Sequence, residues 1–154
     1  MAVEAVLKPE PIVRALRAAF AREATRQELL ALAAKSIRQA GPPYTSVYLY
    51  MLHGDELVLE AYDGRDTPHT RIPVGKGLCG QAVAEGKDIN APDVSAAPGY
   101  LACNLETKSE LVVLIRRGDE ILGQIDIDSD VPAGFSEAEH RAVKQVADAL
   151  AVLL

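Results

Sequence analysis

Residues 46–62, SVYLYMLHGDELVLEAY, contain two β-type runs separated by a short turn. The runs SVYLYML (46–52) and ELVLEAY (56–62) are rich in tyrosine, valine and leucine, and such side chains fit a half-buried pleated surface. The segment between them, His53-Gly54-Asp55, has the glycine that a tight β-hairpin requires. The stretch therefore predicts two antiparallel strands.

A second hairpin is predicted near the end of the chain. SELVVLI (109–115) and EILGQIDID (120–128) flank Arg117-Gly118-Asp119, another glycine-containing turn. Two hairpins joined by tight turns favour an antiparallel sheet over a parallel one.

Helices are predicted at both ends of the chain. Residues 11–41 are rich in Ala, Leu, Arg and Glu, and a capping box at Thr25–Glu28 divides them into two helices. Gly41-Pro42-Pro43 ends the second helix. A capping box at Ser136–Glu139 starts a final helix, whose buried side is expected to hold Val143, Val146, Ala147 and Leu150.

The middle of the chain is less regular. We predict a loop over 63–70, a short strand over 71–74, a helical turn over 81–85 and irregular structure over 87–108, where prolines and glycines recur. The order of helix, strands, long loop, strands and helix predicts an α+β fold, with the N- and C-terminal helices packed on one face of a central antiparallel sheet.

Composition and charge limit the classes of function. The chain has 154 residues, a single-domain length, and a net charge of −6, which argues against nucleic acid as a partner. Residues 1–38 carry a net charge of +3, a pattern we assign to a solvated helix face. No apolar run is long enough to span a membrane, and the charged first residues do not resemble a signal peptide. We therefore expect a cytoplasmic protein with reduced cysteines and no membrane partner.

The stretch IPVGKGLCGQAVAEG (72–86) contains a G-x-G-x-x-G pattern formed by Gly75, Gly77 and Gly80. In dinucleotide-binding proteins this pattern follows a strand of a parallel βαβ unit, with an acidic residue about 20 residues further on. The predicted hairpins argue against that unit. The loop is thus better explained as one that presents a thiol, because Cys79 lies inside it.

Both cysteines of the chain, Cys79 and Cys103, lie in predicted loops among small and polar residues. They are either inert thiols or a reactive nucleophile displayed on a loop. His53, His69 and His140 have no metal-ligand spacing to the cysteines, so we expect no metal.

A candidate acid cluster lies in the last strand. Ile125-Asp126-Ile127-Asp128 alternates strictly, so the isoleucines face the core and the carboxylates face the other way. This pattern describes either a solvated strand face or a pair of neighbouring acids that raise each other's pKa. Glu110, which opens the adjacent strand, is positioned to join them.

These segments resemble a known family. GKGLCG (75–80), PDV (92–94), PG-x-x-AC (98–103), SE (109–110) and G-x-x-DIDS (123–129) are similar to the free methionine-(R)-sulfoxide reductases, a branch of the GAF domains. The resemblance covers roughly residues 44–154. It implies a GAF domain over 42–154 with a ligand cavity beneath loops on the sheet face opposite the helices, and residues 1–41 as a helical segment packed on that domain.

The resemblance also implies roles for particular residues. Cys103 and Cys79 correspond to the redox pair of that family, and Glu110, Asp126 and Asp128 to the residues that hold the substrate. Tyr44 or a neighbour stands where the family has a tryptophan, Tyr100 where it has a histidine, and His69 where it has a further cysteine. Tyr44 and Tyr100 are therefore candidate substrate contacts.

Three functions are compatible with these residues. The first is a reductase of free methionine-(R)-sulfoxide or a similar small sulfoxide, with no bound cofactor and with thioredoxin as external reductant. The second is a non-catalytic GAF sensor of a small molecule, and the third is a thiol redox switch. We also expect a homodimer.

Overall fold

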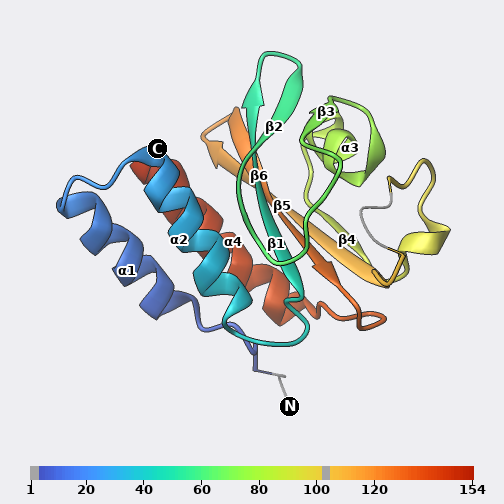
Figure 1. Ribbon diagram of the computed structural model, residues 1–154, viewed down its shortest axis with the longest axis horizontal. Helices are drawn as coiled ribbons and strands as arrows, with labels where there is room; N and C mark the ends of the chain where they lie inside the picture. Colours follow the sequence, from blue (N-terminus) through green and yellow to red (C-terminus); the bar gives the residue numbers. More distant parts are fainter. Residues whose placement is uncertain (1–3, 102–104) are drawn as a thin grey trace.

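The computed structural model describes residues 4–101 and 105–154 of the chain. A central sheet separates the helices into two groups, with α1, α2 and α4 on one side and α3 on the other (Figure 1). In chain order the elements are α1 (Pro9–Ala21), α2 (Arg26–Arg38), β1 (Ser46–His53), β2 (Glu56–Asp63), β3 (Arg71–Pro73), α3 (Gly77–Glu85), β4 (Ile89–Ala91), the 3-10 turn η1 (Val94–Ala96), β5 (Ser109–Arg117), β6 (Glu120–Ser129) and α4 (Glu137–Leu153).

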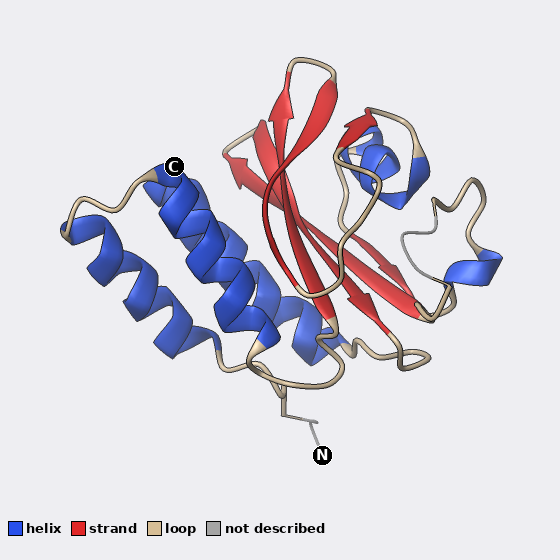
Figure 2. Ribbon diagram, in the orientation of Figure 1, coloured by secondary structure: helices blue, strands red, loops and turns tan. Residues whose placement is uncertain are grey.

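The sheet has the strand order β3-β2-β1-β6-β5-β4, and every pairing in it is antiparallel (Figure 2). Both predicted hairpins are confirmed, because His53 pairs with Glu56 and Arg117 pairs with Glu120 across their turns. The two hairpins meet where β1 pairs with β6 in the middle of the sheet. An antiparallel sheet has no place for the parallel βαβ unit of a dinucleotide fold.

The predicted α+β fold is confirmed: α2 and α4 cover one face of the sheet, and α1 packs against these two helices. Strand residues that point to this face alternate with residues that point to the other, so Ile125 and Ile127 lie in the core beneath the helices. The predicted buried side of α4 is also confirmed: Val143, Val146, Ala147 and Leu150 are buried there.

The two predicted capping boxes differ in outcome. At α2 the Thr25 and Glu28 side chains each accept a hydrogen bond from the other residue's backbone N–H, as expected. At α4 only the Ser136 half forms, with its Oγ accepting from Glu139 N–H. The buried Glu139 carboxylate instead accepts from the backbone N–H groups of Val6 and Leu7, because tertiary contacts offer it closer donors than its own helix does.

The opposite face carries α3 and a second, smaller core. Tyr48, Tyr50, Val112 and Leu114 of the sheet pack there against residues of α3, including Leu78, Cys79 and Ala82. The helix begins at Gly77, four residues before the predicted helical turn. Glycines weaken helix propensity, and packing against the sheet overrides that local preference.

The segment 87–108 was predicted to be irregular, but it contains the edge strand β4. Three residues, Ile89 to Ala91, pair with Val112, Leu111 and Glu110 of β5. So short a strand has no periodicity of its own and forms because the edge of β5 supplies its hydrogen-bond partners. Of the helices in the described residues, none is long and apolar enough to cross a membrane.

Candidate active site

A small cavity lies between the sheet and the first turn of α3. Its volume is about 10 Å³, room for roughly one water molecule. It is lined by Tyr50, His69, Ile72, Lys76, Gly77, Leu78, Cys79, Tyr100, Leu101, Glu110 and Asp126. An amino acid requires more space, so the segment that covers the cavity must move for a ligand of that size to enter.

The segment that covers the cavity follows η1 and includes Tyr100 and Leu101. Leu101 lies so close to α3 that a Cβ atom added to Gly77 would meet its side chain at 3.0 Å. Tyr100 lines the cavity beside it. Cys103, predicted to be the attacking thiol, lies outside the described residues, two positions after Leu101 in the sequence.

The acid cluster comes from two adjacent strands. The alternation of β6 places Asp126 and Asp128 on the face opposite the helices, and Glu110 of β5 pairs directly with Asp128 in the strand register. All three are buried rather than solvated, with relative exposures of 5% or less. The alternative of a solvated strand face is therefore wrong, because α3 and the following loop cover this part of the sheet.

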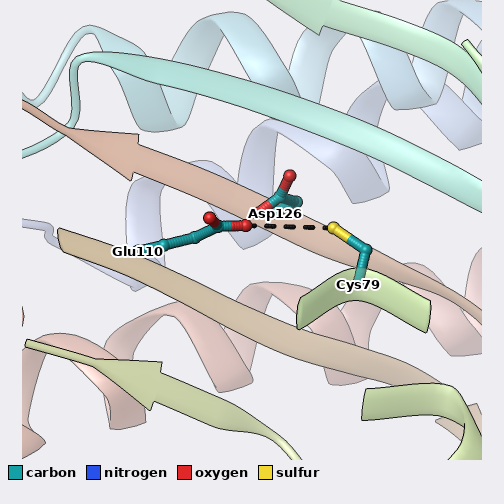
Figure 3. Close-up of side chains that lie close together, drawn as sticks. All are labelled: Cys79, Glu110 and Asp126. Carbon is teal, nitrogen blue, oxygen red and sulfur yellow. Dashed lines mark hydrogen bonds between the residues drawn. The ribbon is translucent and has the colours of Figure 1, made fainter. Parts of the chain in front are cut away.

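Cys79 meets this cluster from the first turn of α3. Its Sγ donates to Glu110 Oε2 across 3.9 Å, as the dashed line in Figure 3 marks. The Cys79 sulfur, a Glu110 oxygen and an Asp126 oxygen all lie within 4.8 Å of one another. Residues from three separate parts of the sequence thus form one compact buried group.

Burial sets the protonation of this group. It raises the pKa of the Cys79 thiol well above its ordinary value, and the negative charges of Asp126 and Glu110 raise it further. Burial also raises the pKa of Asp126, although hydrogen bonds with Glu110 and Cys79 oppose the change. The pKa of Asp128 is raised well above its usual range by burial and then by the charge of Asp126. Burial therefore favours the protonated forms of Cys79, Asp126 and Asp128.

Gln124, which was not among the predicted site residues, helps to hold Cys79 in position. Its Nε2 donates to the Cys79 carbonyl oxygen at 3.0 Å, which ties the first turn of α3 to β6. The alternation of β6 contains the relevant signal, because Gln124 lies two residues before Asp126 and so shares its face of the sheet.

Cys79, Glu110 and Asp126 offer three ligand atoms to a metal ion, the one such group found among the described residues. A cation would have to displace the proton of Cys79, which burial and the neighbouring carboxylates hold firmly. Hydrogen-bond chemistry therefore suits the group better than metal ligation does.

Of the predicted site residues that the structure describes, Asp128 lies beside Glu110 without lining this cavity, and Tyr44 lies on the other side of the sheet. It lies in the core beneath the helices, where its hydroxyl donates to Glu139 Oε1 at 2.6 Å and its ring packs edge-on against Phe135. Tyr50 and Tyr48 are the tyrosines of β1 that point to the α3 face.

We expect Tyr44→Phe to lower the free energy of unfolding by about 1–2 kcal/mol, because it leaves the buried Glu139 with one donor fewer. Ligand binding should be unchanged, since the sheet separates Tyr44 from the cavity. Tyr50→Phe is the matched control: it removes a hydroxyl that donates to the His69 carbonyl at the cavity wall. Chemical denaturation and calorimetric ligand titration of both variants would check this, and a binding defect in Tyr44→Phe alone would contradict it.

Residues 25–154 match the GAF domain family model. The chain belongs to the GAF domain family. Over 97 residues this GAF protein is 36% identical to the free methionine-R-sulfoxide reductase of Escherichia coli, a match that covers 63% of this chain and 58% of that protein. The matched part is thus less than two thirds of that relative's length.

Solved structures agree with the sequence match. The GAF domain superposes with a TM-score of 0.87 on free methionine-R-sulfoxide reductase from Neisseria meningitidis in complex with its substrate, at 30% identity over 99% of this chain and 92% of that one. The type II free methionine-R-sulfoxide reductase from Thermoplasma acidophilum gives a TM-score of 0.80 at 38% identity, over 83% and 91% of the two chains. The resemblance drawn from the sequence is therefore confirmed at the level of the family.

Proposed function

We propose that this GAF protein reduces free methionine-(R)-sulfoxide, with Cys103 as the attacking thiol and Cys79 as the resolving thiol. The observation that carries the proposal is the buried cluster of Cys79, Glu110 and Asp126, which places a thiol beside two carboxyl groups, one of which, Asp126, has a pKa raised by burial. The reductases of this family that share its fold and part of its sequence support the assignment.

The surroundings of Cys79 decide which role each cysteine takes in the proposal. A thiolate attacks sulfoxide sulfur, whereas a thiol does so poorly. The raised pKa of Cys79 keeps it protonated, so it is unsuited to the first attack. In the proposal, Cys103 attacks the sulfoxide sulfur, and Cys79 then attacks the oxidised Cys103.

The first step transfers oxygen from the substrate. The Cys103 thiolate attacks the sulfoxide sulfur while Asp126 or Asp128 gives a proton to the sulfoxide oxygen. The oxygen leaves with Cys103 as a sulfenic acid, and methionine is released as the thioether. The substrate sulfur is reduced by two electrons, and Cys103 is oxidised by two.

The second step restores the enzyme. The Cys79 sulfur attacks the sulfenic sulfur of Cys103, so that a disulfide forms and water departs. An external dithiol, for which thioredoxin is our candidate, then reduces the disulfide and becomes oxidised itself. The homodimer and the cytoplasmic location remain predictions from the sequence.

The test is to incubate the reduced chain with a thioredoxin system and each epimer of free methionine sulfoxide separately. We expect the (R) epimer to be consumed and the (S) epimer to persist, because a site fixed by Glu110, Asp126 and Asp128 accepts one handedness at sulfur. Chromatographic quantification of methionine gives the result. If the chain binds the (R) epimer in calorimetry yet oxidises no thiol, the protein is a GAF sensor and the proposal is wrong.

A further inference from the structure

Gln124 is a buried amide in the middle of the sheet. It is 0% exposed, and in the strand register it pairs with Tyr50 of β1 on one side and Leu114 of β5 on the other. Its Nε2 donates to the Cys79 carbonyl oxygen, but its Oε1 has no hydrogen-bond partner among the described residues. A buried carbonyl oxygen without a donor lowers the free energy of unfolding, so its presence requires an explanation.

The fold alone does not supply that explanation. Tyr50 and Leu114, the strand neighbours of Gln124, belong to the second core, where an apolar side chain of similar size would pack without an unpaired oxygen. The Cys79 carbonyl lies within α3, and a regular helix satisfies such a carbonyl through the N–H four residues further on. Gln124 therefore adds a second donor to an acceptor for which the helix has its own. What the amide contributes is the place where it holds Cys79.

That place is weakly set by the rest of the turn. The Cys79 thiol donates to Glu110 Oε2 across 3.9 Å, a long distance that restrains the sulfur little. The Gly75 N–H donates to the Gly80 carbonyl, a bond that shapes the turn without tying it to the strands beneath. The bond from Gln124 joins this turn to β6, which is paired on both sides in the middle of the sheet.

The second step of the proposed reaction depends on where the Cys79 sulfur lies. In that step the bond between the two sulfurs forms, the S–O bond of the sulfenic acid breaks, and the thiol proton leaves with the oxygen as water. Reacting atoms have to approach to about 3–3.5 Å, and a displacement of about 1 Å can slow a reaction about a hundredfold. Gln124 is not among the described residues that line the cavity, so it acts on this step through Cys79.

We propose that Gln124 is a positioning residue for the resolving step, because its hydrogen bond to the Cys79 carbonyl holds the thiol where it can attack the sulfenic acid. The inference rests on the proposed function for the identity of the oxidised cysteine, Cys103. The first step does not use Cys79 and should not depend on Gln124. Disulfide formation should depend on it.

The experiment follows the two steps separately in Gln124→Met, which keeps the size of the side chain and removes its amide. Reduced chains are mixed with excess methionine-(R)-sulfoxide, without a reductant, and quenched at intervals. We expect methionine to form within about threefold of the wild-type rate and the disulfide to form at least about tenfold more slowly. Dimedone should trap more sulfenic acid on Cys103 than in the wild-type chain. Tm should be unchanged or raised, because the unpaired oxygen is gone.

Gln27→Met is the matched control. It removes the same kind of bond, from a side-chain amide to the Glu60 carbonyl oxygen, made by α2 on the other side of the sheet. Both steps should keep their wild-type rates in this variant.

Different outcomes separate this inference from the proposed function. Disulfide formation at the wild-type rate in Gln124→Met, or equal slowing of both steps, overturns the positioning role while the reductase stands. If the wild-type chain forms no methionine, mild peroxide replaces the sulfoxide as oxidant. Slower bridging in the variant then supports the role, whereas equal bridging, or no bridged species in the wild-type chain, overturns it. If Gln124→Met and Gln124→Leu both fail to fold, the amide serves the fold and the inference is wrong.

Discussion

Serine in place of Cys103 is expected to abolish reduction of methionine-(R)-sulfoxide, with a rate loss of more than about a thousandfold. A hydroxyl cannot form the sulfenic acid that carries the oxygen away. Cys79 cannot replace Cys103, because burial and the adjacent carboxylates keep its thiol protonated. Methionine formation would be followed under single-turnover conditions, with calorimetry to show that Cys103→Ser still binds the sulfoxide within a few-fold of wild type.

Cys79→Ser is the matched variant, and it should behave differently. We expect one equivalent of methionine per chain and then a stall, because the sulfenic acid on Cys103 has no partner thiol. In the wild-type chain, mild peroxide should remove two hydrogens by mass and form a disulfide, which requires the two Cα atoms to approach within about 7 Å in some conformer. Separate oxidation of each cysteine without a bridged species would refute the redox pair.

Asp126→Asn is expected to lower kcat/KM by about a hundredfold, within the usual range for loss of a general acid. The amide has nearly the same shape but cannot release a proton to the sulfoxide oxygen. A steady-state assay across pH should show that wild-type activity declines as the acid pair loses its proton, whereas the variant lacks that dependence. Activity near the wild-type level would show that Asp126 is not the proton donor.

The neighbouring buried carboxyl groups of Asp126 and Asp128, the acid pair, are expected to lower the free energy of unfolding at neutral pH. The folded state raises the pKa of Asp128 above the unfolded value of 3.8, so the folded protein binds this proton more tightly. The free energy of unfolding therefore falls as pH rises from about 4 through the raised pKa. Besides Asp126, the groups that act on this carboxyl are Glu110, Asp130 and Arg65. Asp128→Asn is thus expected to keep or raise Tm at neutral pH, with the difference vanishing near pH 4.

Asp130, two residues after Asp128, provides a control because its pKa is shifted in the opposite direction. Arg65 pairs with it at 2.6–2.7 Å and holds its pKa below the ordinary value. Its stabilising effect is present above about pH 4 and is lost as pH falls through the lowered pKa. Asp130→Asn should therefore lower Tm slightly at neutral pH, by an effect limited by solvent exposure. Equal Tm changes in the two variants would contradict the assignment of burial as the cause for Asp128.

Local patterns in the sequence determined most of the architecture. Glycine-containing turns fixed both hairpins, and alternation along β6 fixed which face receives Asp126 and Asp128. The capping residue Thr25 set the start of α2, and the apolar spacing of α4 set its buried side. Each of these depends on neighbours within a few residues, where strand and helix periods leave few alternatives.

Contacts between distant segments decided the rest. Three features depend on partners that only the folded chain supplies. They are the early start of α3, the formation of the short strand β4, and the hydrogen bond that the Glu139 side chain accepts from the N-terminal segment. The alternation along a strand does not show whether other elements cover the face to which its residues point. The burial of Asp126 and Asp128 is therefore known only from the tertiary packing. The approach of Cys79 to Glu110 and the placement of Tyr44 behind the sheet arose in the same way. A sequence pattern sets the side to which a residue points, whereas the packing of layers sets what it meets there.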